Sequence, residues 1–72
     1  AIIYPNPSKG QVSIKGLPTG AVYRVFDLSG RITSEGLVGE DVVQLSLNSG
    51  IYMVQAQVNG NWNSLGKIIV NP

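Results

Sequence analysis

The chain has 72 residues and a formal net charge of +1, and it contains no Cys and no His. This composition excludes a disulfide, a thiolate nucleophile, a thiolate metal site and a histidine general base. Five Lys and Arg residues also fall far short of the dense basic face that nucleic-acid binding requires, so we expect no nucleic-acid partner. No apolar run is long enough to span a membrane, so we expect no transmembrane segment.

Glycine and proline divide the sequence into short segments that are rich in Val, Ile, Tyr and Thr. Turn signals spaced by about 8 to 12 residues are typical of all-β domains, and no window keeps a helical apolar period between the glycines. The sequence therefore predicts one domain, residues 1–72, with seven strands over residues 1–4, 11–15, 21–27, 31–37, 43–47, 51–58 and 61–70.

The predicted turns carry specific residue signals. Pro5-Asn6-Pro7 ends the first strand, because each proline removes a ladder N–H. Leu17–Gly20 has Pro second and Gly fourth, as a type I turn prefers, and Asp27–Gly30 places a carboxylate where it accepts N–H groups two residues on. Asn59-Gly60 predicts a two-residue type I′ hairpin.

Alternation along the strands predicts two packed sheets. Val43, Leu45 and Leu47 alternate with polar residues, while Tyr52 and Val54 begin a second apolar face. A single sheet of this composition would leave its apolar face in water, so we expect a small antiparallel Greek-key β-sandwich.

Groups suited to catalysis or metal binding are few. Glu40 and Asp41 are adjacent, but a Ca²⁺ site needs six or more converging oxygens, so a solvated turn is the favoured interpretation. We therefore expect no enzymatic activity, no metal and no cofactor. Trp62 lies between two asparagines, and with Phe26 as a second aromatic it leaves open a carbohydrate-binding module of a secreted hydrolase. The favoured interpretation is that Trp62 packs across the hairpin or over the end of the core. A passive spacer or adhesin module is a further alternative.

Four stretches in register carry a resemblance to a known family: Tyr-Pro-Asn-Pro-Ser-Lys-Gly at 4–10, Val-Phe-Asp-Leu-Ser-Gly-Arg at 25–31, Leu-Asn-Ser-Gly-Ile-Tyr-Met-Val at 47–54 and Lys-Ile-Ile-Val at 67–70. Over nearly its whole length the chain resembles the type A C-terminal sorting domain of the type IX (Por) secretion system. The family-motif and recognition residues carried over by this resemblance are Pro5, Asn6, Pro7, Asp27, Gly30, Arg31, Gly50, Tyr52 and Lys67. The chain departs from the commonly basic tail of the family, since it ends in Val70-Asn71-Pro72.

The resemblance implies a seven-stranded immunoglobulin-like sandwich that acts as a non-catalytic secretion signal at the end of a larger secreted protein. Such a domain directs its upstream cargo through the periplasm and across the outer membrane, to the cell surface or the medium. The implied partners are the outer-membrane translocon and a sortase-like cell-surface protease, which usually cleaves the domain off at a bond upstream of it or at its very start.

The motif residues also have structural roles that follow from their chemistry. Pro5 and Pro7 blunt the edge of the first strand, and Gly50 allows the bend that delivers Tyr52 to the core. We expect the contact surface to be the final hairpin, residues 59–70, with Lys67 as its exposed charge.

Overall fold

Seven strands and no helix make up the computed structural model, which describes residues 1–72. No helix long and apolar enough to cross a bilayer is present. The strands are β1 (Ile2–Tyr4), β2 (Gln11–Lys15), β3 (Val22–Asp27), β4 (Ile32–Leu37), β5 (Val42–Ser46), β6 (Gly50–Val58) and β7 (Asn61–Val70). Each predicted strand is confirmed, with ends that differ by no more than one residue.

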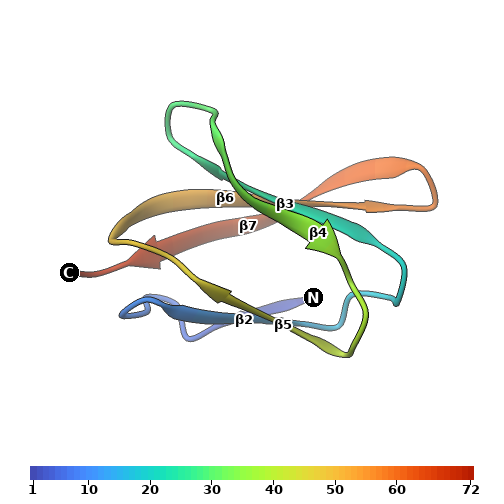
Figure 1. Ribbon diagram of the computed structural model, residues 1–72, viewed down its shortest axis with the longest axis horizontal. Coiled ribbons are helices and arrows are strands. Elements are labelled where there is room, and N and C mark those ends of the chain that lie inside the picture. Colours follow the sequence, from blue (N-terminus) through green and yellow to red (C-terminus); the bar gives the residue numbers. More distant parts are fainter.

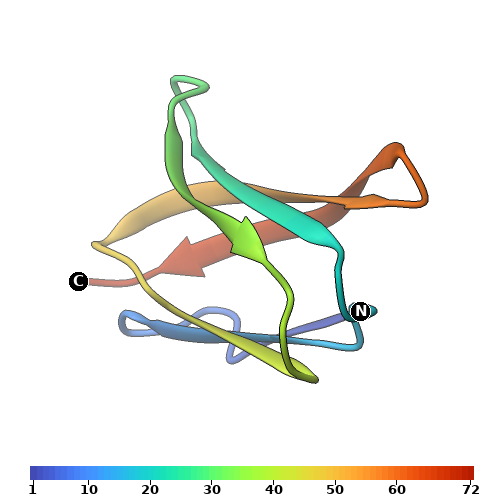
Figure 2. The ribbon, with the colours of Figure 1, turned by 45° about the vertical axis from the view of Figure 1, so that its right-hand side comes forward.

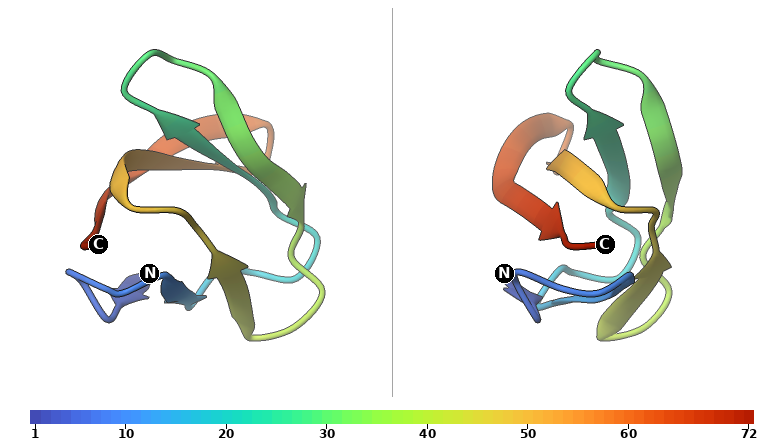
Figure 3. Two further views of the ribbon diagram at one scale, coloured as in Figure 1. Left: turned by 60° about the vertical axis from the view of Figure 1, so that its left-hand side comes forward. Right: turned by 90° about the vertical axis from the view of Figure 1, so that its left-hand side faces the viewer.

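The strands form two antiparallel sheets that pack face to face (Figures 1 and 3). One sheet has the order β1-β2-β5 and the other β4-β3-β6-β7, so β5 returns after the β3–β4 hairpin to pair with β2. This long return is the Greek-key connection of immunoglobulin-like sandwiches, here with the fourth strand joined to the sheet of the third. The predicted seven-stranded antiparallel immunoglobulin-like Greek-key β-sandwich is therefore confirmed.

The core lies between the two sheets and consists of apolar residues from alternating strand positions. Val12 and Ile14 of β2 face Val25, Val54 and other residues of the four-stranded sheet. Thirteen of the fourteen buried residues belong to this cluster, and Ser8 is the single buried polar residue. With only thirteen residues in the core, the domain depends on every strand that contributes to it.

The connection between β5 and β6 carries the chain from one sheet to the other. Gly50 has a φ of 153°, which L side chains rarely adopt. Two residues later the Tyr52 ring enters the core, and its hydroxyl donates a 2.7 Å hydrogen bond to the Asn48 carbonyl. A tyrosine bonded back to the preceding loop is the tyrosine corner of Greek-key sandwiches. The role predicted for Gly50 and Tyr52 in this bend agrees with this geometry.

Two turns test the predicted turn chemistry. Asn59 and Gly60 have φ values of 53° and 82°, as the type I′ hairpin between β6 and β7 requires. The type I prediction for Leu17–Gly20 is wrong by one residue: the Ala21 N–H donates to the Pro18 carbonyl at 3.1 Å, and Gly20, with φ of 91°, is third. A positive φ at the third position is the requirement of a type II turn, which glycine meets without strain.

We predict that Ile68→Ala will lower the free energy of unfolding by about 2–5 kcal/mol, because Ile68 is fully buried and the truncation leaves a cavity. Ile2→Ala is the matched control, since Ile2 is 62% exposed and should change stability by less than about 0.5 kcal/mol. Urea denaturation of the two variants measures both values. Equal losses would mean that β7 does not close the core.

Candidate functional site

The segment Pro5–Ser8 lies along the free edge of β7. The Asn6 Nδ2 donates to the Lys67 carbonyl at 2.7 Å, and the Ile69 N–H donates to Asn6 Oδ1 at 3.0 Å. Ser8 continues the contact through its backbone, which donates to the Ile69 carbonyl and accepts from the Asn71 N–H, both at 2.8 Å. We call this segment the Asn6 clasp.

The clasp replaces a missing neighbouring strand. A primary amide places N–H donors beside a carbonyl acceptor, so the Asn6 side chain satisfies edge groups that would otherwise face water or pair with another chain. Asn6 and Lys67, two of the family-motif residues named in the sequence analysis, are 61 positions apart in the sequence and meet here. The Lys67 side chain remains exposed, and it takes part in neither of the two ion pairs of the structure.

A second group of matched residues forms the turn between β3 and β4. Asp27 Oδ1 accepts hydrogen bonds from the Ser29 hydroxyl at 2.6 Å and from the N–H groups of Ser29 and Arg31 at 3.0 Å. The Gly30 N–H donates to the Asp27 carbonyl at 3.0 Å, which closes the predicted turn. The Ser29 hydroxyl, followed by the Arg31 N–H, lowers the pKa of the Asp27 carboxyl below its ordinary value of 3.8.

These contacts leave Asp27 poorly suited to proton transfer. A general acid needs a carboxyl pKa raised toward neutrality, whereas the pKa of Asp27 moves the other way. The second carboxylate oxygen lies 3.4 Å from the Arg31 Nε, and the Arg31 side chain is 81% exposed, so this ion pair is weak. Tyr52 pairs with Asp27 across the sheet, but its hydroxyl is already bonded to Asn48. The polar atoms of Asp27 and Tyr52 therefore form hydrogen bonds that hold the β3–β4 turn and the tyrosine corner.

The outer face of the four-stranded sheet at this end is apolar. Phe26 pairs with Met53 and with Ile32, Met53 pairs with Lys67, and Ile51 pairs with Ile69. Residues that pair directly across strands point to the same face, so these rows lie side by side. We call Phe26, Ile32, Ile51, Met53 and Ile69 the apolar patch. Analysis of the sequence missed it, although apolar residues on both faces of β3 were a partial signal.

Trp62 lies on this same outer face, farther along β7, and not over the core. The Arg24 guanidinium carbon lies 4.4 Å from the centroid of the Trp62 ring, and the Arg24 Nε lies 3.5 Å from a Glu35 carboxylate oxygen. Trp62 therefore packs across the hairpin, as favoured, because it pairs with Gln57 of β6, and its ring also stacks on a cation from β3. Arg24 occupies one face of the indole, and Trp62 as a whole remains 38% exposed.

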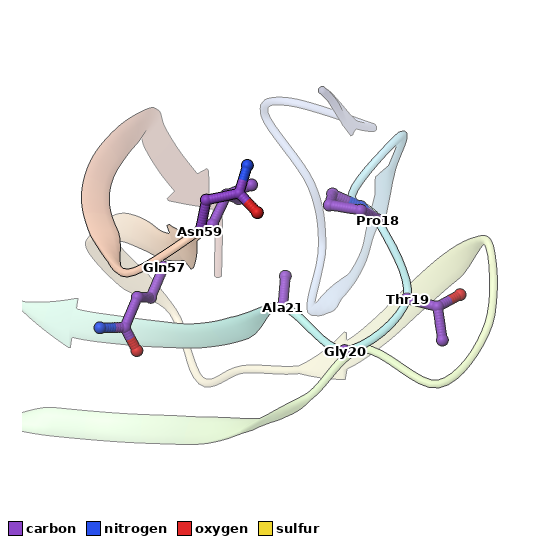
Figure 4. A pocket seen from close by; sticks show the side chains of 7 residues that line it. Pro18, Thr19, Gly20, Ala21, Gln57 and Asn59 are labelled. Atoms are coloured by element: carbon purple, nitrogen blue, oxygen red, sulfur yellow. The ribbon is translucent and has the colours of Figure 1, made fainter.

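The depressions of the surface are shallow and lack convergent acids. Figure 4 shows one between the turn before β3 and the β6–β7 hairpin, with Pro18 and Asn59 on either side of Ala21. No titratable side chain lines it. Glu40 and Asp41 are exposed, and no three acidic side chains are grouped as a metal site would need.

We predict that Asp27→Asn will lower the melting temperature at neutral pH and that its difference from the parent will shrink below about pH 4. The folded state lowers the pKa of Asp27, so its contribution is complete above 3.8 and is lost as the pH falls through the lowered value. Thermal melts at several pH values measure the difference. Ser29→Ala removes the largest cause of the lowered pKa and should make the melting temperature less dependent on pH in this range. A difference in melting temperature between Asp27→Asn and the parent that stays constant with pH would contradict this prediction.

We predict that Asn6→Ala will speed amide exchange at Ile69 and will lower the free energy of unfolding by about 1–2 kcal/mol, since two hydrogen bonds to the β7 edge are lost. Asn63→Ala is the control, because the Asn63 amide bonds only to Asn61, two residues away. Unchanged exchange at Ile69 in Asn6→Ala would show that the clasp does not protect this edge.

Comparison with known families shows which family the chain belongs to. A comparison with curated proteins finds no match. A family model described as the secretion system C-terminal sorting domain, the Por secretion tail, matches residues 2–71. This match includes the four stretches that carry the resemblance, the Asn6 clasp and the Asp27–Arg31 turn. The chain therefore belongs to the family of type IX (Por) secretion system C-terminal sorting domains.

Proposed function

We propose that residues 1–72 are a single C-terminal domain that directs an upstream cargo across the outer membrane by presenting a folded surface to the translocon, without catalysis of its own. The observation that carries this proposal is the family match over residues 2–71. Membership in the family gives the chain the role of a type IX secretion sorting signal, which implies export to the cell surface or the extracellular space.

The chemistry of the matched residues supports a role as a folded signal. Asn6, Asp27 and Tyr52 each direct their polar atoms to backbone groups of the domain itself. Their side chains therefore build the surface, and recognition depends on the groups that this surface leaves exposed, among them Lys67 of β7. The β6–β7 hairpin, visible in Figure 2, carries the exposed Lys67 on β7, which supports the expectation that the final hairpin is part of the contact surface.

We further infer that the cargo passes through the periplasm and that a sortase-like protease cleaves the domain off before β1. Ala1 is exposed and β1 is a strand of three residues at the edge of its sheet. A cut at this point would leave the core of thirteen residues intact, because none of them precedes Val12.

We predict that residues 1–72, fused to the C-terminus of a reporter that carries its own inner-membrane signal peptide, will bring that reporter to the cell surface or the medium of a host with a type IX system. Fractionation and protease accessibility measure the distribution. The matched control carries Ile68→Asp, which places a charge in the core and should leave the reporter in the periplasm. Periplasmic retention of a well-folded parent fusion would refute the proposed function.

A further inference from the structure

The two sheets present outer faces of different chemistry. An antiparallel sheet with one solvated face normally alternates apolar and polar residues, which leaves the outer face polar. The three-stranded sheet departs from this rule only at its short edge strand β1, where the exposed apolar residues Ile2 and Tyr4 pair with the polar residues Lys15 and Ser13. The four-stranded sheet departs from it at the apolar patch.

The patch extends over all four strands of the larger sheet. Ile32, Ile51 and Met53 are 43%, 39% and 39% exposed, while Phe26 and Ile69 are half-buried. The register shift between Val25 and Phe26 brings Ile32 of β4 beside Phe26 and so completes the row that ends at Lys67. Contiguous apolar surface of this kind on a soluble domain marks an interaction site.

Family-motif residues lie at the borders of this patch. The Asn6 clasp bonds the backbone of Lys67 and Ile69 at one edge, and the Asp27–Arg31 turn leads directly into Ile32 at the other. Gly50 immediately precedes Ile51. Three motifs that are far apart in the sequence therefore hold the borders of one surface.

The charges around the patch favour a partner other than a second copy. Asp27 pairs with Arg31 and Glu35 pairs with Arg24, so Lys67 is the charged neighbour without an ion pair. If two patches packed face to face, each would bring an unpaired lysine, and the nearest carboxylates, Asp27 and Glu35, would have to leave their own arginine partners to receive it. Burying an unpaired ammonium is costly, so the complementary surface carries its own carboxylate.

We propose that the apolar patch is the docking surface for a receptor protein of the outer-membrane export machinery, which contributes an apolar surface bordered by a carboxylate opposite Lys67. This inference rests on the proposed function and deepens it, because it names the face that is recognised. The apolar rows supply the buried contact, and the lysine sets its orientation.

Export of the reporter fusion tests the patch through matched charge substitutions. Met53→Glu and Lys67→Glu should each reduce the surface-exposed fraction of the reporter by about tenfold or more, equivalent to about 1.4 kcal/mol of lost binding. Leu37→Glu, at the far end of β4 and 72% exposed, and Lys15→Glu, on the other sheet, are the controls and should export like the parent. Thermal melts establish that each variant is folded. Should Met53→Glu melt early, the exposed Lys67→Glu still decides the outcome.

A photoreactive benzoylphenylalanine gives a direct reading of the contact. Placed at position 53 of the exported fusion, it should cross-link to an outer-membrane protein of the secretion system, and Lys67→Glu should abolish that product. The same probe at position 44, which is exposed on the three-stranded sheet, should give no such product.

The possible results separate the two proposals. Retention of the parent fusion in the periplasm overturns the proposed function and the docking surface together. Equal export of the parent and the folded Met53→Glu and Lys67→Glu fusions overturns the docking surface alone. A dimer in sedimentation that Met53→Glu dissociates, with export unchanged, would assign the patch to a second copy of the chain and would also overturn the inference.

Discussion

The need of each sheet to bury one apolar face against the other governs this domain. Neither sheet has a second layer to cover it, and thirteen apolar residues form the whole core. The chain therefore has to cross between the sheets, and the Gly50–Tyr52 corner is one of those crossings. Because the interior is filled by side chains from both layers, the depressions of the domain lie at its surface.

Polar side chains bond to backbone groups that the burial of apolar residues leaves without partners. Asn6 covers the edge of β7, and Asp27 satisfies the N–H groups of the β3–β4 turn. In both places one short side chain replaces a backbone partner, so the loss of the side chain leaves main-chain groups without a partner inside the domain. The family-motif residues Asn6 and Asp27 thus close an edge and a turn of the domain itself.

The strands and most turns are predictable because their signals are local. Alternation in β5 and β6 and the Asn59-Gly60 pair define these elements without knowledge of any other strand. The error at Pro18–Ala21 arises because a Pro-x-Gly segment fits two turn frames. The Asn6 clasp, the Arg24–Trp62 stacking and the apolar patch depend on strand order, on register and on a β-bulge, and no short stretch of sequence encodes those relations.

The position of β7 has a consequence for protein synthesis. Ile68 and Val70 belong to the core, and Asn71 completes the bonding to Ser8, so the sandwich closes only when the final strand has been made. A chain that ends before β7 would lack two of the thirteen core residues and the backbone groups that the Asn6 clasp contacts. Closure of the sandwich therefore depends on the residues of the domain that are synthesised last.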